Sequence, residues 1–255
     1  MKAIILAAGQ GKRLRPFTSD RPKCLVEIAG TTLLDLQLEV LRSRGIDEIV
    51  LVGGYRSQML RDKGSRLYVN PRFAETNMAW TLFCAEKELN GNVIVTYGDI
   101  VYSGEVLDRL IASPADIGVA IDLAWESYWN VRNTNPLDDA ESLRLGNDGR
   151  IREIGGRPGS LDEIEGQYMG LMKFTHEGLK SLESVAKRLL VQLQSGAVPL
   201  ENSFMTDLLQ IAIDSGVRVD SVPVHGRWVE VDTVSDLHLP LTLERIAAIS
   251  DEVRG

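Results

Sequence analysis

The sequence contains little of several residue types that mark particular classes of protein. Of its 255 residues, two are cysteine and three are histidine. Cys24 and Cys84 stand far apart, without the spacing of a zinc site or a disulfide framework. Basic residues number 28 against 36 acidic ones, which argues against nucleic acid or an anionic membrane surface as a partner. No apolar run approaches the ~18 residues of a membrane span.

The N-terminal segment also lacks the features of a signal peptide, namely a long apolar stretch followed by a small-residue cleavage site. We therefore expect a cytoplasmic protein in a reducing compartment. A length of 255 residues with 44% hydrophobic content suffices for one large core. One domain spanning residues 1–255 is the expectation.

Apolar strands alternate with helical patterns in the first half of the chain. Strands are expected at 3–7, 49–53, 67–69, 93–97 and 117–123, separated by helices at about 32–44, 56–63, 76–88 and 104–112. This alternation predicts an α/β fold with a Rossmann-like, doubly wound, mostly parallel sheet. Its ligand crevice should lie at the carboxyl ends of the strands.

The pattern changes from about residue 124. Here we expect strand and loop excursions that form an inserted small sheet or lid over a substrate pocket. The chain then returns to regular elements, with helices near 176–194 and 201–215, a strand at 217–223, the segment 228–232 and a closing helix from Val234.

The segment after the first strand is the most informative. Gly9 and Gly11 lack the Cβ atom that would keep backbone N–H groups away from an anion, and Arg13 and Lys23 can balance the charge of a triphosphate. The spacing is neither that of a P-loop nor that of a dinucleotide fingerprint. A glycine pair can also serve only to permit a tight turn.

Two aspartates are candidate ligands for a divalent cation. Asp99 follows the strand at 93–97, and Asp232 ends the segment 228–232. A cation held there would neutralise charge when a phosphate attacks a triphosphate. The alternatives are that Asp99 is a turn residue and that Asp232 caps the helix beginning near Ser235.

The N-terminal motif resembles the G-x-G-x-R-L-x-P-x-T…P-K signature of the nucleotidyltransferases that activate sugar phosphates, phosphocholine and related small phosphates. It comprises Gly9, Gly11, Arg13, Leu14, Pro16, Thr18, Pro22 and Lys23. The resemblance covers essentially the whole chain and implies that Asp99 and Asp232 bind Mg²⁺. It also implies a catalytic set of Arg13, Lys23, Asp99 and Asp232.

Further residues resemble the cytidylyltransferase branch of this family. Residues 70–82 are similar to a region that lies against the nucleotide base in phosphocholine enzymes. The segments 76–78, 99–102, 135–141 and 165–168 are similar to enzymes that use phosphoglutamine, with phosphocholine and phosphonate enzymes as neighbours. The nucleotide-binding set implied by the loop and this region is Leu6, Ala7, Ala8, Gly9, Gln10, Gly11, Lys12, Arg13, Lys23, Asn70, Thr76, Asn77, Met78, Trp80, Thr81 and Asp99.

The resemblance divides the domain into a nucleotide-binding half at 1–123 and an acceptor-binding half at 124–255 with the second metal ligand. The acceptor-binding candidates in the second half are Trp125, Tyr128, Trp129, Arg132, Glu165, Gln167 and Tyr168. The three aromatic residues could bind a quaternary ammonium by cation–π contacts, or they could simply pack in the core. Arg132 with the nearby acidic residues offers both charges, which suits a zwitterionic acceptor.

The function implied is transfer of CMP from CTP to a small phosphorylated acceptor, either phosphoglutamine, phosphocholine or a phosphonate, with release of pyrophosphate. Such an enzyme belongs in capsule or phosphonate biosynthesis. Members of the family often dimerise, so a homodimer is compatible with the resemblance. The alternatives are a sugar-1-phosphate nucleotidyltransferase that uses UTP or TTP and an inactive, nucleotide-binding regulatory protein.

Overall fold

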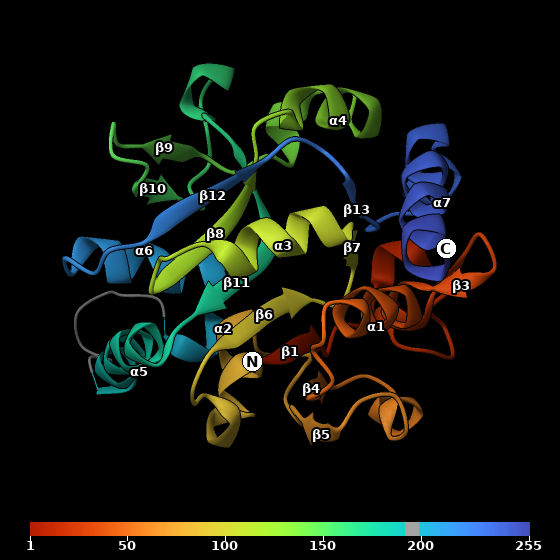
Figure 1. The fold of residues 1–255 in the computed structure, drawn as a ribbon, viewed down its shortest axis with the longest axis horizontal. Helices are drawn as coiled ribbons and strands as arrows, with labels where there is room; N and C mark the ends of the chain where they lie inside the picture. Colours follow the sequence, from red (N-terminus) through yellow and green to blue (C-terminus); the bar gives the residue numbers. More distant parts are fainter. Residues whose placement is uncertain (192–198) are drawn as a thin grey trace.

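A seven-stranded sheet forms the centre of the molecule in this computed structural model, which describes residues 1–191 and 199–255 (Figure 1). In spatial order its strands are β12 (Asp220–Val224), β8 (Ile117–Asp122), β11 (Gln167–Phe174), β6 (Val93–Tyr97), β1 (Lys2–Ala7), β4 (Ile49–Gly53) and β5 (Arg66–Val69). β11 runs antiparallel to both neighbours and the other pairs are parallel. The predicted α/β class and mostly parallel sheet are confirmed.

The sheet is buried on both faces, which explains why its strands read as continuous apolar runs. In β1, Ala3, Ile5 and Ala7 belong to one hydrophobic core. Ile4 and Leu6 alternate with them and belong to the second core, on the opposite face. Strands from both halves of the sequence take part in this one sheet.

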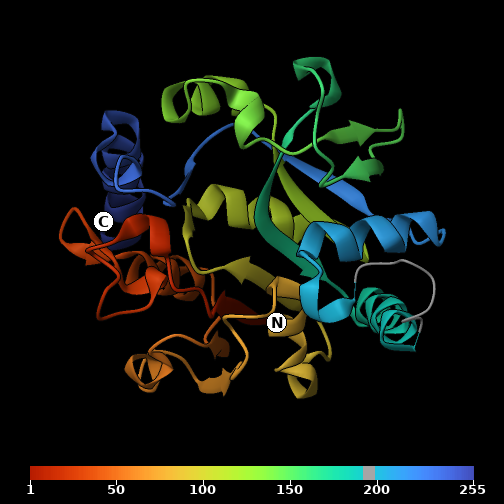
Figure 2. The same ribbon diagram turned by 180° about the vertical axis from the view of Figure 1, so that it is seen from behind.

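Helices cover the two faces in separate groups (Figures 1 and 2). One face carries α1 (Leu33–Ser43), α3 (Gly104–Ala112) and α7 (Pro240–Arg254), and the other carries α2 (Met78–Phe83), α5 (His176–Val191) and α6 (Met205–Asp214). Local sequence sets several boundaries. The Thr32 hydroxyl accepts a hydrogen bond from the Asp35 amide at the start of α1, and Pro240 stands in the first turn of α7, where proline is favoured.

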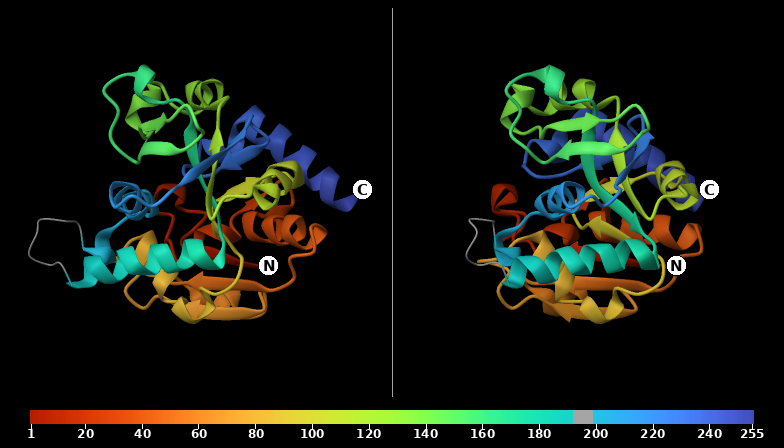
Figure 3. Two further views of the ribbon diagram at one scale, coloured as in Figure 1. Left: turned by 60° about the vertical axis from the view of Figure 1, so that its left-hand side comes forward. Right: turned by 90° about the vertical axis from the view of Figure 1, so that its left-hand side faces the viewer.

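The segment from residue 124 differs from the prediction, because it begins with a helix, α4 (Trp125–Arg132), rather than with strands and loops. Its aromatic residues drive this outcome, since Trp125, Tyr128 and Trp129 recur at helical spacing and are all buried. The expected small sheet follows as β9 (Leu143–Leu145) and β10 (Ile151–Ile154). Both views of Figure 3 show α4 and this hairpin on the same side of the molecule.

Several predicted helices are shorter in the structure. The one at 56–63 is a 3-10 turn, Ser57–Leu60, and the one at 76–88 divides into α2 and the 3-10 turn Glu86–Glu88. The helix expected at 201–215 is the 3-10 turn Leu200–Asn202 followed by α6, and the last residues predicted for 176–194 lie outside the described part. Within the described ranges, none of the helices combines the length and apolar character needed to cross a membrane.

Two short antiparallel ladders complete the fold. β2 (Glu27–Ile28) pairs with β3 (Thr31–Thr32), and β7 (Ile100–Tyr102) pairs with β13 (Trp228–Glu230). The second ladder matters for the site, because it brings the end of β6 beside the segment that follows β13. The backbone N–H of Val231 donates to the Asp99 carbonyl at 3.0 Å.

Candidate active site

The glycine loop at the carboxyl end of β1 is held from within the protein and open on its other side. The Thr18 hydroxyl, fully buried, donates to the Gly11 carbonyl at 2.7 Å. Gly11 adopts φ +61°, and a Cβ there would come within 3.0 Å of the Thr18 and Lys23 side chains. A Cβ on Gly9 would meet no protein atom within 4 Å. The loop is therefore fixed from within by Thr18, while the side of Gly9 on which a Cβ would stand is open.

Lys23, Asp99 and Asp232 meet in the structure, although they are far apart in the sequence. The Lys23 ammonium donates to Asp99 Oδ2 at 2.5 Å and also to Asp232 Oδ1. The 3-10 turn Lys23–Leu25 carries the lysine, while the β7–β13 ladder places the two aspartates together. The three residues predicted to handle the reacting phosphates thus share one hydrogen-bonded group.

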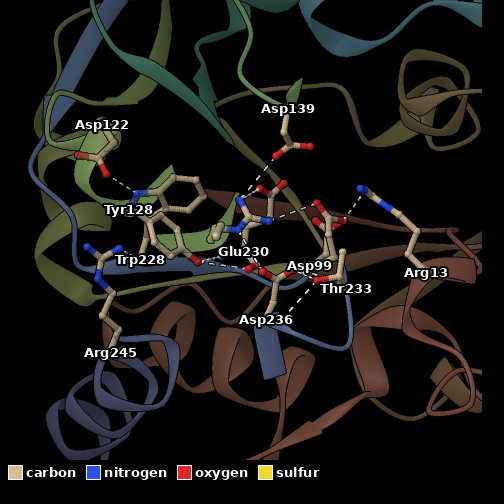
Figure 4. Close-up of polar contacts among 12 residues, drawn as sticks. Arg13, Asp99, Asp122, Tyr128, Asp139, Trp228, Glu230, Thr233, Asp236 and Arg245 are labelled. Atoms are coloured by element: carbon tan, nitrogen blue, oxygen red, sulfur yellow. Dashed lines mark hydrogen bonds and ion pairs between the residues drawn. The ribbon is translucent and has the colours of Figure 1, made fainter. Parts of the chain in front are cut away.

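Further charges join this group to form what we call the charge cluster (Figure 4). Arg13 lies 3.2 Å from Asp232, and the guanidinium of Arg132 reaches Asp232 at 3.5 Å and Glu230 at 2.6 Å. The charge cluster comprises three cations and five carboxylates, namely Arg13, Lys23, Arg132, Asp99, Asp139, Glu230, Asp232 and Asp236. One of these carboxyls is largely neutral near pH 7, because burial beside Asp232 raises the pKa of Glu230 to about 8.

Burial and pairing act against each other in the charge cluster. Burial favours the neutral form of Lys23, but the two carboxylates outweigh burial and raise the pKa of its ammonium above the usual value. Burial likewise opposes ionisation of Asp232, yet Lys23 and the two arginines hold the pKa of that carboxyl below its usual range. Both groups are therefore charged near neutral pH.

The aspartate pair has the chemistry of a divalent-cation site. Asp99 Oδ1 is buried and has no hydrogen-bond partner in the described chain, so it has an unused lone pair. Residues 1–191 and 199–255 contain no group of three or more Asp, Glu, His or Cys side chains arranged to hold a metal. A divalent cation at Asp99 and Asp232 would therefore need further ligands from outside the described residues.

Asp232 does not act as a helix cap, because its backbone and its carboxylate have other partners. Asp236 Oδ2 accepts hydrogen bonds from the backbone N–H groups of Asp232 at 2.9 Å and Thr233 at 2.8 Å. The Asp232 carboxylate instead contacts Lys23 and two arginines. Its side chain is therefore committed to the charge cluster.

Gln37 positions the Asp99 turn, and sequence reasoning missed it. Its fully buried side-chain amide donates to the carbonyls of Tyr97, at 2.7 Å, and Ile100, on either side of Asp99. The available signal is a glutamine within the apolar stretch 33–41, which forms the buried face of α1. A buried amide in such a stretch needs partners, and here those partners are the backbone that carries a candidate metal ligand.

A cavity of about 280 Å³ opens beside the charge cluster. Both predicted halves of the chain contribute to its wall, which is formed by Arg13, Met78, Tyr97, Asp99, Trp129, Asp139, Glu141, Gln167, Tyr168, Met169, Gly170, Phe204, Thr206, Glu230 and Asp232. An irregularity in β11 shapes this wall. Gly170 adopts φ +75°, and a Cβ there would overlap the Tyr97 ring.

Several predicted nucleotide-binding residues have structural roles in the region around α2. Asn70 is fully buried, and its amide donates to the Thr76 and Thr81 hydroxyls at 2.9 and 3.0 Å. Both of its N–H donors are thus used internally, which is incompatible with the expected pairing to a base. The Asn77 amide donates to the Asn202 carbonyl at 2.8 Å. Trp80 lines a separate groove beside α5.

The predicted acceptor-binding residues divide into three groups. Trp129, Gln167 and Tyr168 line the cavity, and Arg132 lies in the charge cluster. Trp125 and Tyr128 pack in the core, which is the second of the two alternatives for the aromatic residues. Glu165 is exposed outside the cavity wall and accepts a hydrogen bond from the Leu145 backbone at 2.5 Å.

Instead, Tyr128 supports the charge cluster from the core side. Its hydroxyl accepts a hydrogen bond from the Glu230 backbone N–H at 3.0 Å, and its ring packs edge-on against Trp228 with centroids 5.8 Å apart. The Arg245 guanidinium lies 4.5 Å from the ring centroid of Tyr128. Figure 4 shows these side chains beside Glu230. The aromatic residues thus form a rigid wall behind the carboxylates.

Comparison with known proteins identifies the family. Residues 3–152 match the MobA-like NTP transferase domain. The chain belongs to this family. It is 36% identical to the CTP:phosphoglutamine cytidylyltransferase of Campylobacter jejuni over 252 residues, which are 94% of this chain and 99% of that protein. It is also 39% identical to the choline-phosphate cytidylyltransferase of Streptococcus pneumoniae over 117 residues, 44% of this chain and 51% of the relative.

Solved structures support the fold assignment for this family member. The inositol-1-phosphate CTP transferase from T. maritima superposes with a TM-score of 0.77 at 24% identity, over all of this chain and 98% of that one. The resemblance to nucleotidyltransferases and their cytidylyltransferase branch, inferred from the N-terminal motif and residues 70–82, is therefore confirmed. Membership of a nucleotidyltransferase family also confirms the enzyme class.

Proposed function

We propose that the protein is a CTP-dependent cytidylyltransferase that joins CMP to a small phosphorylated acceptor and releases pyrophosphate. The supporting observation is its 36% identity to the phosphoglutamine enzyme over nearly the full length of both chains. The site described above is consistent with that chemistry. We extend the proposal to a cytoplasmic enzyme, active as a homodimer, in capsule or phosphonate biosynthesis.

The proposed reaction is a single in-line displacement at the α-phosphorus of CTP. An acceptor oxygen that is already anionic near pH 7 needs no general base, so positioning and charge neutralisation carry the rate. The backbone of residues 8–12 would bind the triphosphate, Arg13 the β- and γ-phosphates, and Lys23 the α-phosphate together with the acceptor. The Lys23 ammonium donates to both aspartates and carries three N–H donors, so a third remains for substrate.

Asp99 and Asp232 are the proposed ligands of Mg²⁺, which would neutralise charge between the α-phosphate and the acceptor. The two halves of the domain then have separate roles, with residues 1–123 binding CTP and residues 124–255 binding the acceptor. Because the Asn70 amide is internally bonded, base recognition in this proposal rests on the backbone around 76–80 and on the remaining Asn77 carbonyl oxygen.

Pyrophosphate release tests the proposal directly. CTP, UTP, dTTP and ATP would each be offered with phosphoglutamine, phosphocholine, 2-aminoethylphosphonate and glucose 1-phosphate. We expect CTP to exceed UTP by ~10-fold or more in kcat/KM, because reversing the donor and acceptor on the base leaves polar groups unpaired. Preference for glucose 1-phosphate with UTP or dTTP would favour the sugar-phosphate alternative. CTP binding without any turnover would favour the regulatory alternative.

A further inference from the structure

The wall of the cavity includes residues with polar atoms that have no partner in the described chain. Trp129 and Gln167 are 2% and 4% exposed. The indole N–H of Trp129 and the side-chain carbonyl oxygen of Gln167 are buried and lack hydrogen-bond partners in the part of the chain that the structure describes. Buried polar groups in native proteins are normally satisfied. A ligand that fills this cavity is the natural source of the missing partners.

Glu141, which is half-buried, lines the same wall without a protein partner. Its carboxylate forms no hydrogen bond and no ion pair within residues 1–191 and 199–255. The charges that act on it are those of two other carboxylates, Asp207 and Asp139. Burial beside those two groups raises the pKa of Glu141 to about 7. In the charge cluster every carboxylate has a basic partner, so Glu141 stands apart.

These groups define the ligand that would complement them. An ionised carboxylate can only accept hydrogen bonds, and an indole N–H can only donate one. A ligand group that complements Glu141 is therefore a cation that carries N–H donors. The group that complements Trp129 is an oxygen acceptor. A quaternary ammonium supplies the charge but no N–H group, whereas a primary ammonium supplies both.

On the basis of the proposed function, we propose that Glu141 binds a primary ammonium group of the phosphorylated acceptor, with Trp129 and Gln167 bonding the polar atoms beside it. The acceptor class is then an amino-acid-like or primary-amine phosphate or phosphonate rather than a phosphocholine. An amino acid presents an ammonium and a carboxylate on one carbon, which matches the carboxylate of Glu141 and the N–H of Trp129.

The test compares two acceptors that differ only in N-methylation. Phosphoethanolamine carries a primary ammonium, and phosphocholine carries a trimethylammonium on the same skeleton. With CTP saturating, we expect wild-type kcat/KM to favour phosphoethanolamine by about 10- to 100-fold, because charge-assisted hydrogen bonds are lost on methylation. Glu141→Gln should reduce kcat/KM for phosphoethanolamine by a similar factor, chiefly through KM, and change that for phosphocholine by less than about threefold.

Glu126→Gln provides the matched control, because it removes one carboxylate from the exposed surface of α4. It should leave both acceptors unaffected. Trp129→Phe, which removes the N–H and keeps a ring in the core, should lower activity with phosphoglutamine more than with phosphoethanolamine, which has no carboxylate.

The outcomes separate this inference from the function on which it rests. Turnover of both acceptors with equal efficiency, or an equal loss for both in Glu141→Gln, would overturn the assignment of Glu141 and leave the cytidylyltransferase proposal intact. Absence of CTP-dependent pyrophosphate release with every acceptor, including phosphoglutamine, would overturn the proposed function itself.

Discussion

Asp99→Asn is the substitution that best separates catalysis from stability at this site. The asparagine keeps the size of the side chain and its place in the turn held by Gln37, but it removes the negative charge. Lys23 retains its contact with Asp232, and Asp99 Oδ1 has no partner to lose in the described chain. Few native contacts therefore depend on the charge of Asp99.

The expected magnitudes follow from this geometry. Losing one partner of a fully buried ion pair costs about 3–5 kcal/mol when the remaining charge is unpaired. Here Lys23 stays paired and the Asp99 side chain is 21% exposed, so we expect about 1 kcal/mol, or about 2–4 °C in Tm. The loss in turnover should reach 100-fold or more, which corresponds to about 2.7 kcal/mol of transition-state stabilisation.

The assay is pyrophosphate release at several Mg²⁺ concentrations, with thermal melting of the same samples. Asp35→Asn is the control, since it breaks the 2.7 Å contact with Lys63 away from the cavity; we expect it to retain activity. A kcat within threefold of wild type for Asp99→Asn, or a loss explained by the unfolded fraction alone, would refute a metal-binding role. An unchanged Mg²⁺ dependence with reduced kcat would point to Lys23 positioning instead.

Three further predictions concern the same wall. Asp232→Asn should lose as much activity as Asp99→Asn but lower Tm further, because its carboxylate contacts three cations; equal melting temperatures for the two variants would contradict this. Lys23→Met should mainly reduce kcat, while Arg13→Met should mainly raise the KM for CTP, since Arg13 is exposed and its proposed role is to bind the ground-state triphosphate. If steady-state kinetics show the same changes in kcat and KM for both variants, the two residues do not have these separate roles. Because the pKa of Glu141 is raised to about 7, the folded state binds its proton more tightly than the unfolded state, and stability falls as pH rises from about 4.5 to 7. Glu141→Gln should therefore gain Tm relative to wild type between pH 5 and pH 8, and a pH-independent difference would show that burial does not perturb this carboxyl.

The sequence by itself determined the sheet and the loop at the end of its first strand. Apolar runs such as 3–7 and 49–53 can be stable only when both faces are covered, so their burial follows from composition and period. Gly9, Gly11 and Lys23 were predictable as a group because their spacing belongs to a short stretch of chain whose conformation depends on near neighbours.

Which aromatic and charged residues would reach the cavity was decided by tertiary structure. Trp125 and Trp129 stand four residues apart on one helix, yet only Trp129 lines the cavity, because the neighbouring strand β13 determines what each side of α4 meets. The sequence predicted Arg132 as a ligand-binding residue. In the structure its guanidinium is instead surrounded by four carboxylates from other segments.

The same reason explains Asp232, Gln37 and Glu141. The Asp232 carboxylate contacts Lys23, which is 209 residues away in the sequence, and does not cap the helix that follows. Gln37 acquires its role from a turn sixty residues away. A carboxylate such as Glu141 is distinguished by having no basic partner, which depends on every segment packed around it. Local sequence therefore determines which elements form, whereas the packing of distant segments determines which side chains are satisfied and which remain free to bind a ligand.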